Sequence, residues 1–99
     1  MRVLLDQNAS RGLRNQFPGH DVSSARQRGW AELENGELIA AAEAAGFDVL
    51  ITADQNIRYQ QNLSGRRLAL VVLDTNHWDV IRGRIALIRD AVNNAVAGS

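Results

Sequence analysis

Apolar positions along this chain gather in short runs that are separated by turn residues and by stretches with helical spacing. Met1–Leu5, Asp48–Thr52 and Leu68–Leu73 form three of the runs, and His20–Ser23 forms a shorter and weaker one. The run Leu68–Leu73 shows no alternation of apolar and polar residues, which is typical of a central parallel strand covered by helices on both faces. The pattern therefore predicts four strands.

Helices are predicted between these strands. The first covers Ala9–Phe17 and ends at a Pro-Gly pair, the second covers Gly36–Ala45, and the third covers Gln55–Asn62. Asn35 has the position and the side chain of an N-cap for the second helix. Residues 24–34 carry no clear period and are predicted to form a loop.

The clearest helical pattern lies near the C-terminal end. An apolar stripe at helical spacing is formed by Ile81, Ile85, Ile88, Val92 and Val96. Asn76 and Asp79 have the spacing of a capping box before this stripe. Strands that alternate with helices indicate a single α/β domain over residues 1–99, with a mostly parallel four-stranded sheet and right-handed crossovers.

Three predicted strands end in an acid: Asp6 follows the first, Asp54 the third and Asp74 the fourth. Ligands of parallel α/β sheets bind outside the carboxyl ends of the strands, so these side chains are expected at one edge. Carboxylate oxygens are the ligands that Mg²⁺ and Mn²⁺ prefer. We expect a Mg²⁺ or Mn²⁺ site with Asp6, Asp54 and Asp74 as catalytic and metal-binding residues, and Glu37 as a further ligand.

Each acid also has a purely structural interpretation. Asp54 has the position of a cap for the helix that begins at Gln55. Asp74 fits a turn with the two residues that follow it, and Glu37 lies in the first turn of its helix, where the helix dipole favours an acid. Asp6 is harder to explain in this way, because a carboxylate at the inner end of a central strand is costly unless it is paired.

Arginines near the strand-end acids are candidates for substrate binding. Arg11 and Arg14 follow Asp6 by one to two helical turns, and Arg58 follows Asp54 by four residues. Guanidinium groups beside an acidic site suit the phosphates of a phosphodiester substrate. Asn8 and Thr52, which lie two residues from Asp6 and Asp54 respectively, complete the expected substrate-binding set. The alternative is that these arginines are exposed charges on helices.

The composition excludes several classes of protein. The formal net charge is zero, with eleven arginines and no lysine, so any contact with RNA must be local. The chain has no cysteine, which excludes disulfides and thiolate metal sites. No apolar stretch approaches the ~20 residues of a membrane span, and Asp6 interrupts the only apolar run near the start, so a cytoplasmic protein without a membrane partner is expected.

Three segments together resemble a family of small bacterial PIN-like proteins related to the VapC-type toxins. They are residues 4–8 (LLDQN), Gly29 with residues 35–38 (NGEL), and residues 50–57 (LITADQNI). The family motifs run L-D-E-N-L-P, then G with s-D-e-e-I, then T-x-D-x-D-F. The resemblance implies a three-layer PIN-like fold and a Mg²⁺- or Mn²⁺-dependent endoribonuclease. It also implies a toxin that is neutralised by a small antitoxin protein.

Several positions depart from the family pattern. Gln7, Asn35 and Asn56 stand where the family has acids, and an amide lacks the charge that holds a divalent cation. The alternative function is therefore an inactive PIN-like module that binds a partner protein or forms a homodimer through an apolar face near Trp30 or Trp78. A receiver-like phosphoacceptor domain shares the expected sheet, but it requires a lysine that this chain does not have.

Overall fold

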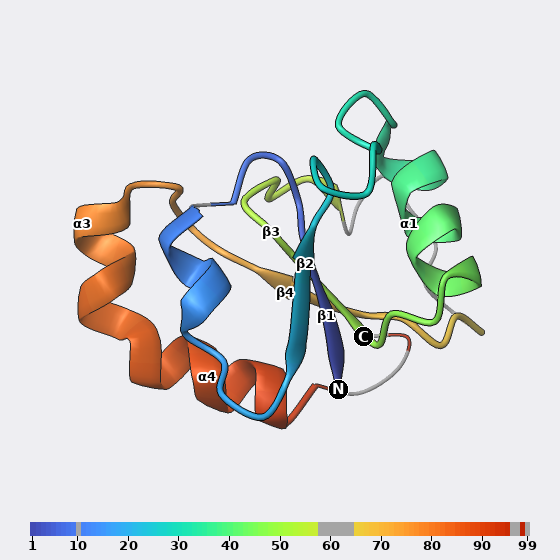
Figure 1. Ribbon diagram of the computed structural model, residues 1–99. Helices are drawn as coiled ribbons and strands as arrows, with labels where there is room; N and C mark the ends of the chain where they lie inside the picture. Colours follow the sequence, from blue (N-terminus) through green and yellow to red (C-terminus); the bar gives the residue numbers. More distant parts are fainter. Residues whose placement is uncertain (10, 58–64, 96–97, 99) are drawn as a thin grey trace.

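The computed structural model describes residues 1–9, 11–57, 65–95 and 98, and a parallel sheet of four strands lies at its centre (Figure 1). The strands are β1 (Arg2–Leu5), β2 (Asp21–Ser24), β3 (Val49–Thr52) and β4 (Ala69–Val72). Their order in the sheet is β2-β1-β3-β4, and every neighbouring pair is parallel. The α/β class is confirmed, and each strand lies within one residue of its predicted bounds.

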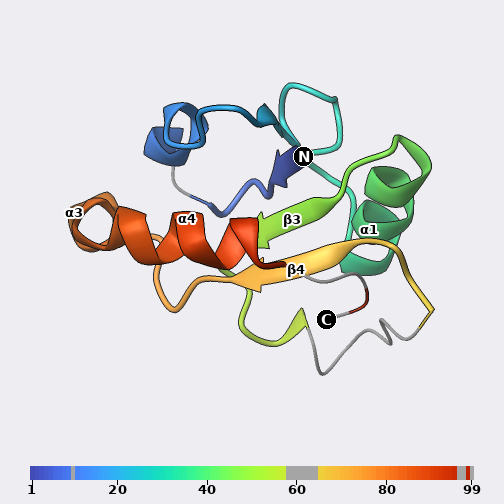
Figure 2. The same cartoon turned by 90° about the horizontal axis from the view of Figure 1, so that it is seen from below.

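Apolar clusters cover both faces of the sheet, and residues from helices belong to both clusters. The helical segments within the described residues are η1 (Arg11–Asn15), α1 (Asn35–Ala44), α3 (Trp78–Ile81), η2 (Arg82–Arg84) and α4 (Ile85–Asn93). Figures 1 and 2 show α1 on one side of the sheet and α3 and α4 on the other. Val3 and Leu5 belong to the cluster that includes residues of η1, α3 and α4, whereas Leu4 belongs to the cluster that includes residues of α1. Burial on both faces explains why the strands read as continuous apolar runs.

The first predicted helix is much shorter than expected. Within the predicted range Ala9–Phe17, the described residues form only the 3₁₀ helix η1. Gly12 lies in this segment and weakens a regular helix, since glycine loses more backbone freedom on folding than other residues. Leu13 and Phe17 are nevertheless buried, as their spacing predicted.

Helix α1 begins one residue earlier than predicted, and Asn35 is not its N-cap. The N-cap is Glu34, which forms a capping box with Glu37. Asn35 is instead the first residue of the helix, and its side-chain amide donates a hydrogen bond to Asp54. The cap prediction was wrong because this distant partner takes the Asn35 side chain.

The single C-terminal helix that was predicted is divided into α3, η2 and α4. It begins after His77 rather than Asn76, so the predicted capping box is not formed, and Asp79 pairs with Arg82 at 3.6 Å instead. Gly83 lies in the 3₁₀ segment between the two α-helices. The apolar stripe is confirmed in part: Ile81, Ile88 and Val92 are buried, Ile85 is half-buried, and Val96 lies outside the described residues.

Two other sequence predictions fall partly or wholly outside the described residues. The predicted helix Gln55–Asn62 lies outside them from residue 58 onward, and Arg58 lies outside them as well. Within the described part of the chain, no helix is long and apolar enough to cross a membrane.

Both tryptophans are half-buried and contact other described residues. Trp30 meets Phe47 edge to face at 6.1 Å between ring centroids, and the Arg28 guanidinium lies 4.9 Å from the Trp30 ring centroid. The half-buried Trp78 ring lies against Gly12 of η1. The most exposed large apolar side chain among the described residues is that of Leu87, which is 69% exposed.

We expect Gly12→Ala to lower the free energy of unfolding by about 1–3 kcal/mol, which is typical of overpacking. A Cβ atom at position 12 would lie 2.6 Å from Trp78 ring atoms, so the ring or η1 must move. Urea unfolding followed by tryptophan fluorescence measures the loss. Gly83→Ala is the matched control, because no atom lies within 4 Å of its added Cβ. Equal stability of the two variants would show that Trp78 does not hold η1 in place.

Candidate functional site at the carboxyl edge of the sheet

The strand order creates a topological switch point between β1 and β3. After β1 the chain continues to β2 on one side of the sheet, and after β3 it continues to β4 on the other side. Loops that leave neighbouring strands in opposite directions open a crevice at the carboxyl ends, where α/β proteins bind ligands. Asp6 follows β1 directly, and Asp54 comes two residues after the end of β3, so both acids lie at this point.

Thr52 joins the two acids. Its side chain is fully buried, and its hydroxyl donates to Asp6 Oδ2 at 2.7 Å and accepts the Asp54 backbone N–H at 3.1 Å. Asp6 Oδ1 accepts the backbone N–H of Gln7 at 2.7 Å. Asn8 closes the network by accepting the Ala53 backbone N–H at 3.0 Å. The structure therefore brings together Asp6, Asn8, Thr52 and Asp54, as the sequence predicted.

The Asp54 carboxylate is held by the start of α1 and by its own turn. Asn35 Nδ2 donates to Asp54 Oδ2 at 2.6 Å, and the Asn56 backbone N–H donates to Asp54 Oδ1 at 3.0 Å. The second bond is the cap-like contact that the structural interpretation of Asp54 predicted. The first bond joins two positions that lie 19 residues apart, so it was not visible in the sequence pattern.

Asp74 and Glu37 lie in other contacts. The Asp74 carboxylate accepts two hydrogen bonds from Arg84 Nη1, at 3.0 and 3.1 Å, and its side chain is 73% exposed. Glu37 completes the capping box of α1. Among the described residues, no three acidic, histidine or cysteine side chains are placed to hold a metal ion. The expected centre of three or four carboxylates is therefore not assembled there, because Asp74 and Glu37 have local partners.

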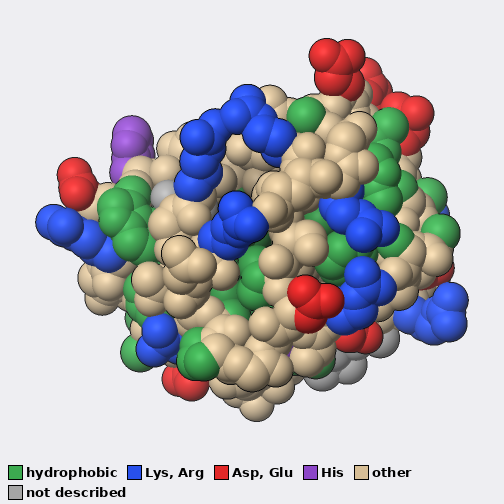
Figure 3. Space-filling view, in the orientation of Figure 1, with side chains coloured by type: hydrophobic (Ala, Val, Ile, Leu, Met, Phe, Trp, Pro, Cys, Tyr) green, Lys and Arg blue, Asp and Glu red, His purple; other side chains and the backbone are tan. Residues whose placement is uncertain are grey.

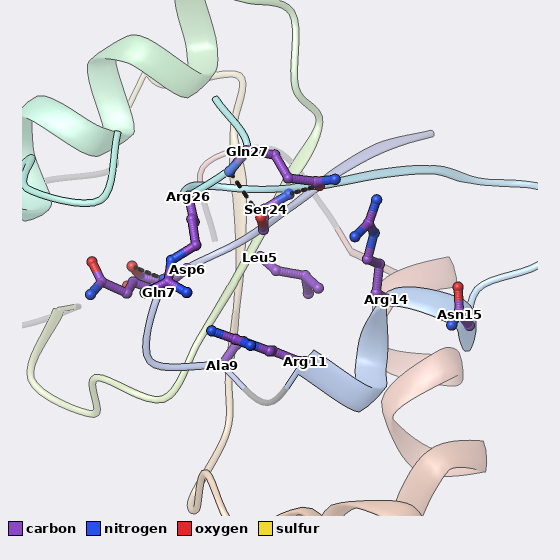
Figure 4. Close-up of a pocket in the computed structure, with 10 residues that line it drawn as sticks. All are labelled: Leu5, Asp6, Gln7, Ala9, Arg11, Arg14, Asn15, Ser24, Arg26 and Gln27. Atoms are coloured by element: carbon purple, nitrogen blue, oxygen red, sulfur yellow. Dashed lines mark hydrogen bonds between the residues drawn. The ribbon is translucent and has the colours of Figure 1, made fainter. Parts of the chain in front are cut away.

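A pocket of about 530 Å³ lies beside Asp6, at the carboxyl ends of β1 and β2 (Figure 4). Arg11 and Arg14 of η1 line it, which agrees with their predicted place near the site. Arg26, from the turn after β2, lines it as well. Figure 4 shows that Arg11 and Arg26 extend toward Asp6 from different elements, and that Arg14 lies on the side of Asn15.

Basic side chains are prominent on this face of the molecule. Figure 3 shows them gathered over the region where Figure 1 places η1 and the end of β2, with most acidic side chains at the margin of the face. Among the described residues, Asp6 is the single acid that lines the pocket. The pocket therefore carries a formal excess of positive charge, which favours an anionic ligand.

The contribution of the β2 turn was missed at the sequence level. Register pairs Leu5 with Ser24, so the residues after β2 lie beside those after β1. Ser24, Arg26 and Gln27 thereby reach the pocket. The weak strand signal at His20–Ser23 was the only indication, since it placed the end of β2 one residue from its observed position.

Comparisons of this chain with protein-family models, with curated proteins and with solved structures give no significant match.

Proposed function

We propose that this chain is a PIN-like domain that binds RNA at the carboxyl edge of its sheet. The observation that carries the proposal is the set of three arginines, Arg11, Arg14 and Arg26, in one pocket beside Asp6. Guanidinium groups bind phosphate oxygens through paired N–H donors, which suits a phosphodiester backbone. The motifs that resemble the PIN-like family favour RNA as the nucleic acid.

Binding without cleavage is the activity that the described contacts support best. A catalytic metal requires carboxylate oxygens, and Asp54 accepts hydrogen bonds from Asn35 and Asn56 while Asp74 is paired with Arg84. The amides at Gln7, Asn35 and Asn56 add no charge to the site. We therefore propose a domain that holds RNA and that has lost most or all of its nuclease activity.

We expect single-stranded RNA to bind with an affinity that falls as salt rises. Three phosphate contacts predict a slope of about −2 in a plot of log Kobs against log salt concentration. The double variant Arg11→Gln and Arg14→Gln should bind more weakly and have a shallower slope, because two contacts are removed. Fluorescence anisotropy of a labelled oligoribonucleotide at several salt concentrations measures both quantities.

The matched control removes two charges elsewhere. Arg66→Gln with Arg67→Gln changes the net charge equally, and these residues lie just before β4, at the amino end of the strands. If the control variant lost as much RNA affinity as the pocket variant, the affinity would depend on net charge alone. Absence of binding at low salt in the unchanged protein would refute the proposal.

A metal-dependent endoribonuclease is the second candidate, and one observation favours it. The Thr52 hydroxyl donates to the Asp6 carboxylate and accepts the Asp54 backbone N–H, which holds both residues at the switch point. Mg²⁺ is often held by one or two carboxylates together with substrate phosphates. Asp6 and Asp54 would hold the ion, which when bound supplies an activated water and neutralises developing charge. Incubating RNA with Mn²⁺ separates the candidates: cleavage that is lost in Asp6→Asn favours the nuclease, and intact RNA favours binding alone.

A further inference from the structure

The three arginines of the pocket differ from most others in the described chain. No hydrogen bond, ion pair or ring contact to another described residue engages the guanidinium of Arg11, Arg14 or Arg26. Six other described arginines do have a partner for the guanidinium: Arg2, Arg28, Arg66, Arg82, Arg84 and Arg89. Three cations without partners in one pocket repel each other, and an anion between them removes that repulsion.

The turn that carries Arg26 is held in place by its own hydrogen bonds. The Gln27 N–H donates to Ser24 Oγ at 3.1 Å, and the Ser24 N–H donates to Gln27 Oε1 at 3.0 Å. The Ala25 N–H donates to the Leu5 carbonyl at 2.8 Å, which anchors the turn to β1. Arg26 therefore projects from an anchored backbone into the pocket, and little backbone entropy is lost when a ligand binds there.

Asp6 does not neutralise these arginines through a direct ion pair. Its two carboxylate oxygens accept the Thr52 hydroxyl and the Gln7 N–H. After β4, at the opposite end of the strand order from β2, the Arg84 guanidinium is already paired with Asp74. The uncompensated positive charge at this edge of the sheet is thus on the side of β1 and β2 rather than on the side of β4.

We propose that this pocket is a phosphate subsite, that Arg26 is one of its ligands, and that it holds a phosphate group of RNA without a divalent cation. The inference rests on the proposed function for the identity of the ligand as RNA. A volume of about 530 Å³ accommodates a phosphate with part of its nucleotide. The bound strand then passes over the ends of β1 and β2, on the side away from Asp74.

The first experiment uses inorganic phosphate as the probe, in a buffer with EDTA. Backbone amide spectra of the isotope-labelled protein should shift at residues 5–7, 11–15 and 24–27 during the titration. Arg26→Gln should weaken phosphate binding by about tenfold, as expected for loss of a charge-assisted hydrogen bond. Arg67→Gln is the matched control, because it removes the same charge from a guanidinium outside the pocket.

The second experiment repeats the comparison with single-stranded RNA. Weaker RNA binding in Arg26→Gln than in Arg67→Gln supports the subsite, and equal binding in the two variants overturns it even if the unchanged protein binds RNA well. Phosphate that binds at the pocket of a protein with no affinity for RNA would support the subsite while refuting the proposed function. Phosphate binding that occurs only when Mn²⁺ is present would overturn the metal-free assignment.

The source of the phosphate is distinguished by two oligoribonucleotides of one sequence. Tighter binding of the oligonucleotide with a 5′-phosphate than of its 5′-hydroxyl form would assign the pocket to a strand end. Equal affinities, each reduced by Arg26→Gln, would assign it to a phosphate within the strand.

Discussion

Thr52→Val should lower the free energy of unfolding by about 2–6 kcal/mol, because two polar groups lose their partner and each such loss costs about 1–3 kcal/mol. Valine has nearly the shape of threonine, so the fully buried site stays filled. It removes the hydroxyl that donates to Asp6 and accepts the backbone N–H of Asp54. Urea denaturation monitored by far-ultraviolet circular dichroism measures the difference.

Thr52→Ser is the matched control for this prediction. Serine keeps the hydroxyl and loses one methyl group, so a loss of only about 1 kcal/mol is expected. The opposite ranking, with valine more stable than serine, would mean that packing rather than the hydrogen bonds to Asp6 and Asp54 makes position 52 important.

The sheet was predictable from the sequence because its signal is local and dense. Leu68–Leu73 is apolar throughout, and residues buried on both faces of a parallel strand have to be apolar. Helix ends depend on fewer atoms and on partners far along the chain. Asn35 has the side chain of an N-cap, yet it donates to Asp54 while Glu34 caps α1.

The candidate site was predictable only where position along a strand determines position in space. Asp6 and Thr52 follow from the ends of β1 and β3, and the structure joins them. Arg26 depends on the register between β1 and β2, which the weak pattern of β2 did not give. Asp74 was placed correctly after β4, but its pairing with Arg84 depends on how the chain turns into the C-terminal helices.

The bond between Asn35 and Asp54 has a direct consequence for metal binding. An amide nitrogen lies 2.6 Å from a carboxylate oxygen, and this contact joins α1 to the loop after β3. Asn35 is also one of the positions where the resembling family carries an acid. A carboxylate of the same shape would bring two negative oxygens together, which is unfavourable unless a proton or a divalent cation lies between them.

We expect Asn35→Asp to lower the free energy of unfolding by about 2–3 kcal/mol at neutral pH in EDTA, through loss of a charge-assisted hydrogen bond and like-charge repulsion. Mn²⁺ should restore part of this loss, because a ligand that binds only the folded state stabilises it. At ten times the dissociation constant the gain is about 1.4 kcal/mol. For a domain of this size, that gain raises Tm by about 5 °C or more, which differential scanning fluorimetry detects.

Asn35→Ala separates the two parts of this prediction. Alanine removes the hydrogen bond to Asp54 without adding a charge, so it should be destabilised and show no response to Mn²⁺. If Mn²⁺ raised the Tm of the alanine variant as much as that of Asn35→Asp, the ion would bind elsewhere. A response confined to Asn35→Asp would mean that Asp54 lacks only one neighbouring carboxylate to take a divalent cation, and that the amide at position 35 keeps this edge of the sheet free of metal.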